Sequence, residues 1–450
     1  MNEAAVGKRM FSDQDLYKLI VPLVIEQALA FFVGVADTMM VSYAGEAAMS
    51  GVSLVDMYTF LVSTFLAALG TGGAVVVSQY IGHRDQKQAN ESAGQLMLIA
   101  LIGSMLMMVF SLVLRSQIIG LFYPSIEEDV RRAAVRYILI TACSYPFLGL
   151  YNASAALFRS MKKTTHTMVV SIIMNIINVV GNAIGIFVLH AGVDGVAVPT
   201  LLSRMAACFL MTGMLFMKGQ QIRVSLSSIF RVDKEHIRRV LHIAVPNSIE
   251  NGLFALGRIL VTSIVSMFGT HQIAASGAAL SVGTIAIMVC SGNNLACVTV
   301  IGQCVGAGEY EQAKYYMKRI LKISYMGNIA ITIIMQIFLH RILGLYDLSP
   351  EAVKYAYTLV TIHNVCACFI HPTSFNLANG LRATGDAAYT MKVGMVSMFI
   401  FRVGAAILFG ILLNFQIIGV WMAMISDWTA RSCAFIWRFK SGKWKEKRAI

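Results

Sequence analysis

The chain has 450 residues, of which 57% are hydrophobic and only 13% are charged, and its mean hydropathy is +0.69. A soluble protein carries about 25% charged residues, so this composition excludes an ordinary soluble enzyme and indicates a polytopic membrane protein. The net charge of +13 does not indicate nucleic-acid binding, because the basic residues border apolar segments. Charge that sets membrane topology and contacts anionic lipid headgroups explains them.

Apolar stretches separated by polar residues predict an all-α fold of twelve transmembrane helices, each long enough for a bilayer core about 30 Å thick. The predicted spans are 17–42, 50–80, 91–115, 130–157, 165–189, 194–217, 240–268, 274–304, 314–340, 352–378, 387–412 and 416–438. We expect 1–217 to form an N-lobe, 218–239 a linker, and 240–450 a C-lobe with a basic tail. The linker sequence VDKEHIRRVLHI is a candidate short interfacial helix.

Basic residues concentrate in both tails and in alternate loops, the central linker among them, whereas the other connections are short or acidic. Loops rich in lysine and arginine stay on the cytoplasmic side of a membrane. The sequence therefore predicts a multi-pass protein of the bacterial inner membrane with both termini in the cytoplasm.

An internal repeat relates the two halves of the chain. Shifting the sequence by 224 residues places Pro22 on Pro246 and Glu26 on Glu250, and residues 21–89 then share 14 identities with 245–313. Such a repeat predicts two six-helix bundles with the same orientation, related by an axis along the membrane normal. Bundles of this kind usually enclose a cavity and open it alternately to the two sides.

Two acids lie in the first predicted span, where a charged side chain is costly and indicates function. Glu26 and Asp37 are eleven residues apart, which places them on nearly the same helix face, although Glu26 has the alternative of a position at the water interface. In the second half of the chain Val261 stands at the Asp37 position, and Arg258 stands at the Gly34 position. Asp37 is therefore the natural cation site, binding a proton or a metal ion.

The fifth predicted span carries three asparagines on one face. Asn175, Asn178 and Asn182 follow a spacing of i, i+3 and i+7, so their amide oxygens are available to a cation or a protonated acid near Asp37. Hydrogen bonds that hold neighbouring helices together are the alternative explanation. Thr200 in the sixth span is a weaker candidate alone, because a threonine in a helix usually bonds its own backbone.

Other charged residues in the predicted spans have two interpretations each. Glu250 and Arg258 form either a structural pair or a substrate contact. Asp56 lies near a helix end, where it is either solvated or part of a site. Asp427 and Arg431 are spaced to neutralise each other, and Arg431 is expected to extend to the membrane surface.

Several segments resemble the multidrug and toxic compound extrusion (MATE) family. They are PLVIEQ…ADTMMVSYAG, VSQYIGHRDQKQA, its repeat VIGQCVGAGEYEQA, NLANGLRATGD and GVWMAM…DW. The resemblance covers nearly the whole chain. It implies a V-shaped pair of six-helix bundles that exports organic cations and drugs in exchange for inward Na⁺ or H⁺.

The resemblance also assigns roles to individual residues. Asp37 matches the cation-binding aspartate of the first helix, and Pro22 matches the proline where that helix bends. Asn178 matches the asparagine of an N-x-x-x-D pattern, in which Asn182 replaces the aspartate. Thr200 matches a threonine that completes the site in some members. With one carboxylate replaced, the coupling ion stays open between Na⁺, held by Asp37, and H⁺.

We therefore expect a monomeric, cation-coupled exporter of small amphipathic organic cations that works in the lipid bilayer without a cofactor or nucleic acid. Candidate substrate or gating residues are Glu26, Glu250, Arg258, Asp56 and Asn175. The alternative transporter is a flippase for lipid-linked saccharides, which Arg258 and Arg402 favour. An integral-membrane enzyme is not expected, because none of the nine histidines stands in a catalytic or metal-binding pattern.

Overall fold

The computed structural model describes residues 9–122, 126–346, 348–447 and 449–450, and this part of the chain contains helices and no strand. Tyr17–Ser248 form one compact unit, called here the N-terminal unit. Ile249–Ala449, with the described residues up to Leu16, form the other, called the C-terminal unit. The boundaries predicted for the lobes and the linker stay predictions.

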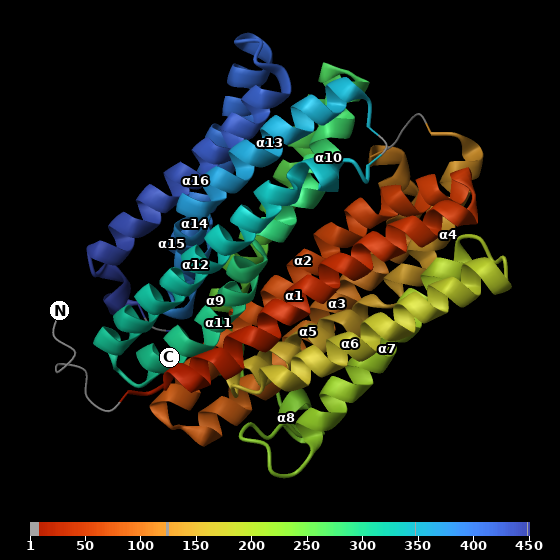
Figure 1. Cartoon of the computed structure of the whole chain (residues 1–450). Helices are drawn as coiled ribbons and strands as arrows, with labels where there is room; N and C mark the ends of the chain where they lie inside the picture. The colour runs from red at the N-terminus through yellow and green to blue at the C-terminus, as the bar shows by residue number, and fades with distance from the viewer. Residues whose placement is uncertain (1–8, 123–125, 347, 448) are drawn as a thin grey trace. The chain divides into compact units, whose positions relative to one another are not determined.

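The N-terminal unit consists of long helices that run side by side (Figure 1). They are α1 (Asp13–Val41), α2 (Glu46–His83), α3 (Gln86–Phe122), α4 (Glu128–Ala142), α5 (Tyr145–Ser160), α6 (Thr164–Ala183), α7 (Asp194–Phe216) and the short α8 (Leu226–Phe230). The next helix, α9 (Lys234–Val265), starts in this unit and continues into the other.

The C-terminal unit repeats this pattern. It contains α10 (Thr270–Ala286), α11 (Met288–Gly306), α12 (Tyr310–Leu343), α13 (Pro350–Phe369), α14 (His371–Ala383), α15 (Ala387–Ser397) and α16 (Gln416–Lys440). Helical turns of wider, π-type winding continue α15 through residues 398–404 and 407–412. Within the unit α10 packs on α13, and α14 packs on both α11 and α16.

Nine described helices are long and apolar enough to cross a membrane, and eleven spans result if each of two bent pairs counts as one. The bent pairs are α4 with α5, at 47°, and α13 with α14, at 48°. A helix satisfies its backbone hydrogen bonds internally, which a lipid environment requires. The predicted all-α membrane fold is confirmed, and each of the twelve predicted spans coincides with one helix or a consecutive pair. The twelfth, α16, carries four charged residues and is not among the apolar helices.

α1 continues through Pro22 without a break. A proline has no backbone N–H, so the carbonyl of the residue four positions earlier loses its helical partner. That carbonyl belongs to Lys18, and the buried Thr164 hydroxyl of α6 donates to it at 3.2 Å. The side chain of a neighbouring helix thus replaces the missing hydrogen bond. The bend predicted at Pro22 stays a prediction.

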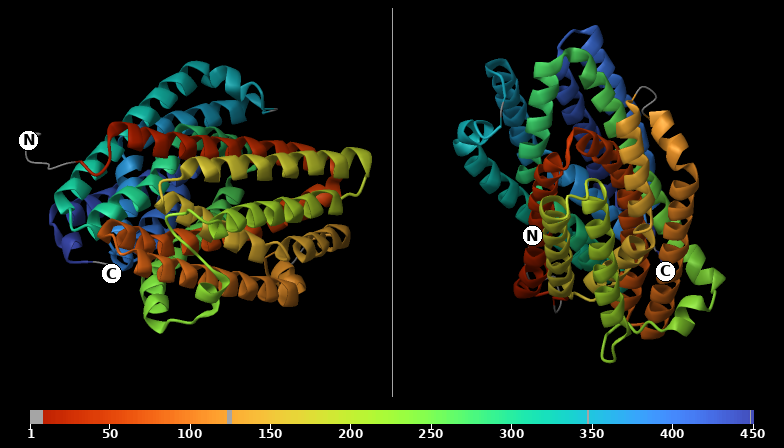
Figure 2. Two further views of the ribbon diagram at one scale, coloured as in Figure 1. Left: turned by 90° about the horizontal axis from the view of Figure 1, so that it is seen from below. Right: turned by 90° about the vertical axis from the view of Figure 1, so that its right-hand side faces the viewer.

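α6 and α7 approach each other closely because small residues face each other. A Cβ added to Gly185, in the π-type turn Ile184–Val188 that continues α6, would collide with the carbonyl oxygen of Gly195. One added to Gly181 would lie 2.6 Å from the ring of Pro199. Figure 2 shows the two helices side by side, in yellow and yellow-green. This contact brings the asparagine face of α6 against Thr200 of α7.

The start of α9 corrects one prediction. Residues of VDKEHIRRVLHI do not form a separate interfacial helix, because Lys234 onward belongs to α9. The Asp233 carboxylate accepts hydrogen bonds from the backbone N–H groups of Glu235 and His236, at 2.9 and 3.3 Å, and so caps the new helix. The separate short helix is α8, which Ser225 and Ser228 cap reciprocally.

Candidate functional site

A cavity of about 300 Å³ lies within the N-terminal unit. α1, α2, α4, α6 and α7 line it, and its polar or charged lining residues are Asp37, Thr38, Ser53, Asp56, Tyr137, Asn175, Asn178, Thr200, Ser203 and Arg204. The structure therefore brings five predicted site residues to one cavity: Asp37, Asp56, Asn175, Asn178 and Thr200. Asn182 of α6 is not among the residues that line the cavity, but it donates a hydrogen bond to the same Asp37 carboxylate.

Asp37 is held by two asparagines of α6. Asn182 Nδ2 donates to Asp37 Oδ1 at 3.0 Å. The Asn178 amide lies between the Asp37 carboxylate and the Thr200 hydroxyl. With its nitrogen toward Asp37, this amide donates to Oδ1 at 3.0 Å and to Oδ2 at 2.9 Å, and its oxygen accepts from Thr200 Oγ1 at 3.2 Å.

With the amide turned the other way, Nδ2 would donate to Thr200 Oγ1 at 3.2 Å and the amide oxygen would face Asp37. In that arrangement Thr200 Oγ1 also donates to the Val196 carbonyl at 2.9 Å. An amide oxygen and an ionised carboxylate are both acceptors, so this orientation requires a proton or a cation between them.

The cavity contains a second acid and one base. Tyr137 Oη donates to Asp56 Oδ1 at 3.3 Å, and Arg204 Nη1 donates to Ser144 Oγ at 2.7 Å. With both acids ionised, Asp37 and Asp56 against Arg204 leave one negative charge in the cavity. Sequence reasoning missed Arg204, although an arginine inside an apolar span was a signal for it.

Two of the three asparagines on this face have a polar atom without a hydrogen-bond partner in the described part of the chain. Asn175 Nδ2 and Asn182 Oδ1 are buried and have no hydrogen-bond partner among the described residues. Buried amide groups normally find partners, and those that do not mark sites for a ligand or a water. The predicted asparagine face therefore forms part of the cavity wall and also joins α6 to α1 and α7 through hydrogen bonds.

Glu26 lies apart from the cavity. Its side chain is buried, accepts from Arg159 at 2.5 Å in an ion pair, and accepts from the Thr167 hydroxyl at 2.9 Å. The alternative of a solvated Glu26 at the membrane surface is wrong. The ion pair with Arg159 joins α1 to α5, and the hydrogen bond from Thr167 joins α1 to α6.

Glu250 has an equivalent arrangement in the C-terminal unit. Its Oε1 pairs with Arg382 of α14 at 2.6 Å and with Arg431 of α16 at 3.3 Å, so its structural pair is not Arg258. Arg431 is only 3% exposed, and the expectation that it extends to the membrane surface is wrong. The aromatic rings of Phe254 and Phe375, at 5.3 and 4.9 Å from its guanidinium carbon, stabilise it instead.

Asp427 is fully buried and does not neutralise Arg431. Its Oδ2 lies 3.9 Å from Arg402 Nη1, and its Oδ1 accepts from the Ser397 hydroxyl. The i, i+4 spacing suggested a local pair on α16, but both partners of Asp427 come from α15 and its continuation. Tertiary contacts decide the pairing.

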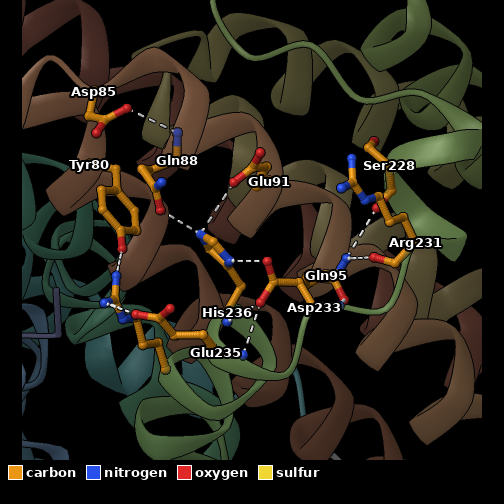
Figure 3. Close-up of polar contacts among 11 residues, drawn as sticks. Tyr80, Asp85, Gln88, Glu91, Gln95, Ser228, Arg231, Asp233, Glu235 and His236 are labelled. Carbon is orange, nitrogen blue, oxygen red and sulfur yellow. Dashed lines mark hydrogen bonds and ion pairs between the residues drawn. The ribbon is translucent and has the colours of Figure 1, made fainter.

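Among the described residues, one group of three histidine, cysteine or acidic side chains is close enough to share a metal ion: Glu91, Asp233 and His236. His236 Nδ1 lies 3.0 Å from Asp233 Oδ2, and Nε2 lies 2.7 Å from Gln88 Oε1 and 3.7 Å from Glu91 Oε2 (Figure 3). The backbone N–H of His236 lowers the pKa of the Asp233 carboxyl below its usual range. The hydrogen bond between His236 Nε2 and Gln88 fastens the start of α9 to α3, and this structural role explains the cluster without a metal.

Comparison with known proteins decides the family. The model of the MatE family matches the chain twice, over residues 22–184 and again over 246–408. The chain belongs to the MatE family. The two matches begin at residues 22 and 246, an offset of 246 − 22 = 224, which is the offset of the internal repeat. The resemblance to MATE transporters and the repeat are both confirmed, and the members of this family are transporters rather than enzymes.

Relatives match along nearly the whole chain. The "Uncharacterized transporter YisQ" of Bacillus subtilis (strain 168) is 29% identical and the match covers 96% of this chain and 95% of the relative. The "Probable multidrug resistance protein NorM" of Thermotoga maritima is 25% identical, over 97% and 94% of the two chains. A solved structure described as the "Outward-facing conformation of a multidrug resistance MATE family transporter of the MOP superfamily" matches with a TM-score of 0.89, at 20% identity, over 96% of each chain. That last match shows the fold.

Proposed function

We propose that this chain exports small amphipathic organic cations, drugs among them, in exchange for inward movement of Na⁺ or H⁺. Family membership and the names of the relatives support export. The observation that carries ion coupling is the Asp37 carboxylate, held by Asn178 and Asn182 in a cavity inside the N-terminal unit. A carboxylate at membrane depth is expensive unless it binds an ion or a proton.

Ion binding at Asp37 changes the contact between α6 and α7. While the carboxylate is ionised and empty, the Asn178 nitrogen points to Asp37 and the Asn178 oxygen accepts from Thr200. A proton or Na⁺ on Asp37 favours the opposite orientation, in which Asn178 donates to Thr200. One amide therefore passes the state of α1 to α7, and this differential interaction shifts the conformational equilibrium of the unit.

The site offers suitable ligand groups to either H⁺ or Na⁺. A proton on Asp37 needs one acceptor, which the Asn178 oxygen supplies. Na⁺ needs several oxygen ligands, and Asp37, the Asn178 oxygen, the unpartnered Asn182 Oδ1 and Thr200 Oγ1 offer them. In the cycle we propose, the ion enters from outside, the N-terminal unit closes on it, and the hold on the substrate weakens. The two six-helix halves alternate their access, with both chain termini in the cytoplasm of a bacterial cell.

The experiment uses proteoliposomes that hold a fluorescent organic cation and the purified protein. Dye movement is measured with an inward Na⁺ gradient at equal pH, and separately with a pH gradient in Na⁺-free buffer. The proposal predicts movement driven by at least one gradient and abolished when that gradient is collapsed. Dye movement that is equal with and without both gradients would contradict ion coupling.

A further inference from the structure

The start of α1 is fastened to the C-terminal unit. The described residues up to Leu16 belong to that unit, and Tyr17 onward belongs to the N-terminal unit. α1 nevertheless runs without a break from Asp13 to Val41. This helix therefore starts in one unit and ends in the other, and the candidate coupling acid Asp37 lies near its far end. The docked start of the helix has no part in the ion site.

Phe11 is the centre of the docked segment. It is only 1% exposed, and its ring packs edge-on against that of Tyr316 of α12, with 5.4 Å between the ring centroids. The Tyr316 hydroxyl contacts both backbone groups of Phe11: it accepts from the N–H at 2.9 Å and donates to the carbonyl at 2.8 Å. Buried backbone groups need such partners, so Tyr316 makes the burial of Phe11 possible.

Neighbouring residues of the segment bind the same face of α12. The backbone N–H of Met10 donates to Gln312 Oε1 at 2.9 Å, and Arg319 Nη2 donates to Asp13 Oδ1 at 3.3 Å. Gln312, Tyr316 and Arg319 follow a spacing of i, i+4 and i+7, so they form one stripe on this helix. Three positions of the segment thus bind three positions of one helix face.

These contacts are not needed to begin α1, because the helix start is capped locally. Ser12 Oγ accepts from the backbone N–H of Asp15 at 3.1 Å, and Asp15 Oδ2 accepts from the backbone N–H of Ser12 at 2.9 Å. The first residues of a domain are usually poorly ordered unless something ties them down. The contacts with α12 therefore add a connection that the helix start itself does not require.

We propose that residues 9–16 are a permanent tether, which fastens the start of α1 to α12 and so passes the ion state of Asp37 to the C-terminal unit. This inference rests on the proposed function, in which Asp37 binds the coupling ion. A continuous helix is a rigid element, and coupling between distant sites can travel along such an element. The tether stays attached in every step of the cycle, which distinguishes it from a gate that opens and closes.

The test weakens the tether and measures transport by the full chain in proteoliposomes. Tyr316→Phe keeps the ring but removes the hydroxyl that holds Phe11. It should slow gradient-driven movement of a fluorescent organic cation by about fivefold or more, the lower end of ordinary coupling between sites. The matched control is Tyr315→Phe, because the hydroxyl of this neighbouring tyrosine has no hydrogen bond with the described residues. The control should transport as the wild type does, and thermal unfolding checks that both variants fold.

A cross-link separates a tether from a gate. Met10→Cys and Gln312→Cys, joined by a short bifunctional thiol reagent, hold the segment on α12 after Tyr316→Phe has removed its hydrogen bonds. Restored transport supports the tether. Transport that the cross-link fails to restore, or Tyr316→Phe transport at the wild-type rate, overturns it. A wild-type protein without gradient-driven transport would instead overturn the proposed function, so the two failures are distinguishable.

Discussion

The ion pair between Glu26 and Arg159 offers a direct test of what holds the N-terminal unit together. Their side chains are only 7% and 12% exposed, and their atoms are 2.5 Å apart. Arg159→Met removes one partner and leaves a buried carboxylate with the Thr167 hydroxyl as a remaining donor. Removing one member of a buried pair costs about 3–5 kcal/mol.

For a unit of this size that cost corresponds to a fall in the melting temperature of about 6–20 °C. The assay is thermal unfolding of the purified protein in detergent, followed by intrinsic fluorescence. The double variant Glu26→Gln with Arg159→Met removes both charges and should recover much of the loss. The control is Arg132→Met, because that arginine and its partner Asp129 are 71% and 75% exposed. Such surface pairs contribute about 0–1 kcal/mol.

The reasoning is refuted if Arg159→Met melts within about 2 °C of the wild type, or if the double variant is less stable than the single one.

Three further predictions concern the frame around the site. Thr164→Val should cost about 1–3 kcal/mol, because it leaves the Lys18 carbonyl unpaired, and thermal unfolding against Thr164→Ser checks this. Gly195→Ala should destabilise the protein through its contact with α6, whereas Gly213→Ala, which has open space around it, should be neutral in the same assay. Asp233→Ala should cost about 0.5–2 kcal/mol at pH 7. Because the folded-state pKa of Asp233 is lowered, its stabilisation is present above about pH 4 and is lost as the pH falls, so the difference in melting temperature should narrow in acid.

The membrane fold and the core of the candidate ion site follow from local patterns in the sequence. Long apolar stretches dictate helices, and a carboxylate or an amide inside such a stretch is noticeable without knowledge of its neighbours. Asp37, Asn178 and Thr200 were predicted on that basis, and the structure brings all three together. The difference in charge between the two halves was also visible in the sequence, because Val261 and Arg258 interrupt the repeat.

Partners that come from distant helices could not be predicted. Arg431 binds Glu250, which is 181 positions away in the chain, while the spacing on α16 suggested Asp427. Tyr137 reaches Asp56 from α4 because of how α4 packs on α2. Helical spacing describes one helix at a time, and the pairing of buried charges depends on which helices meet.

The most direct test of ion coupling replaces Asp37 by Asn. The amide keeps the size of the side chain and its hydrogen bond with Asn182 but cannot take up a proton or carry the charge that binds Na⁺. In proteoliposomes the account predicts that Asp37→Asn abolishes gradient-driven movement of a fluorescent cation, while the exposed control Asp129→Asn transports as the wild type does. Unchanged gradient-driven transport by a folded Asp37→Asn protein would contradict the role assigned to this carboxylate.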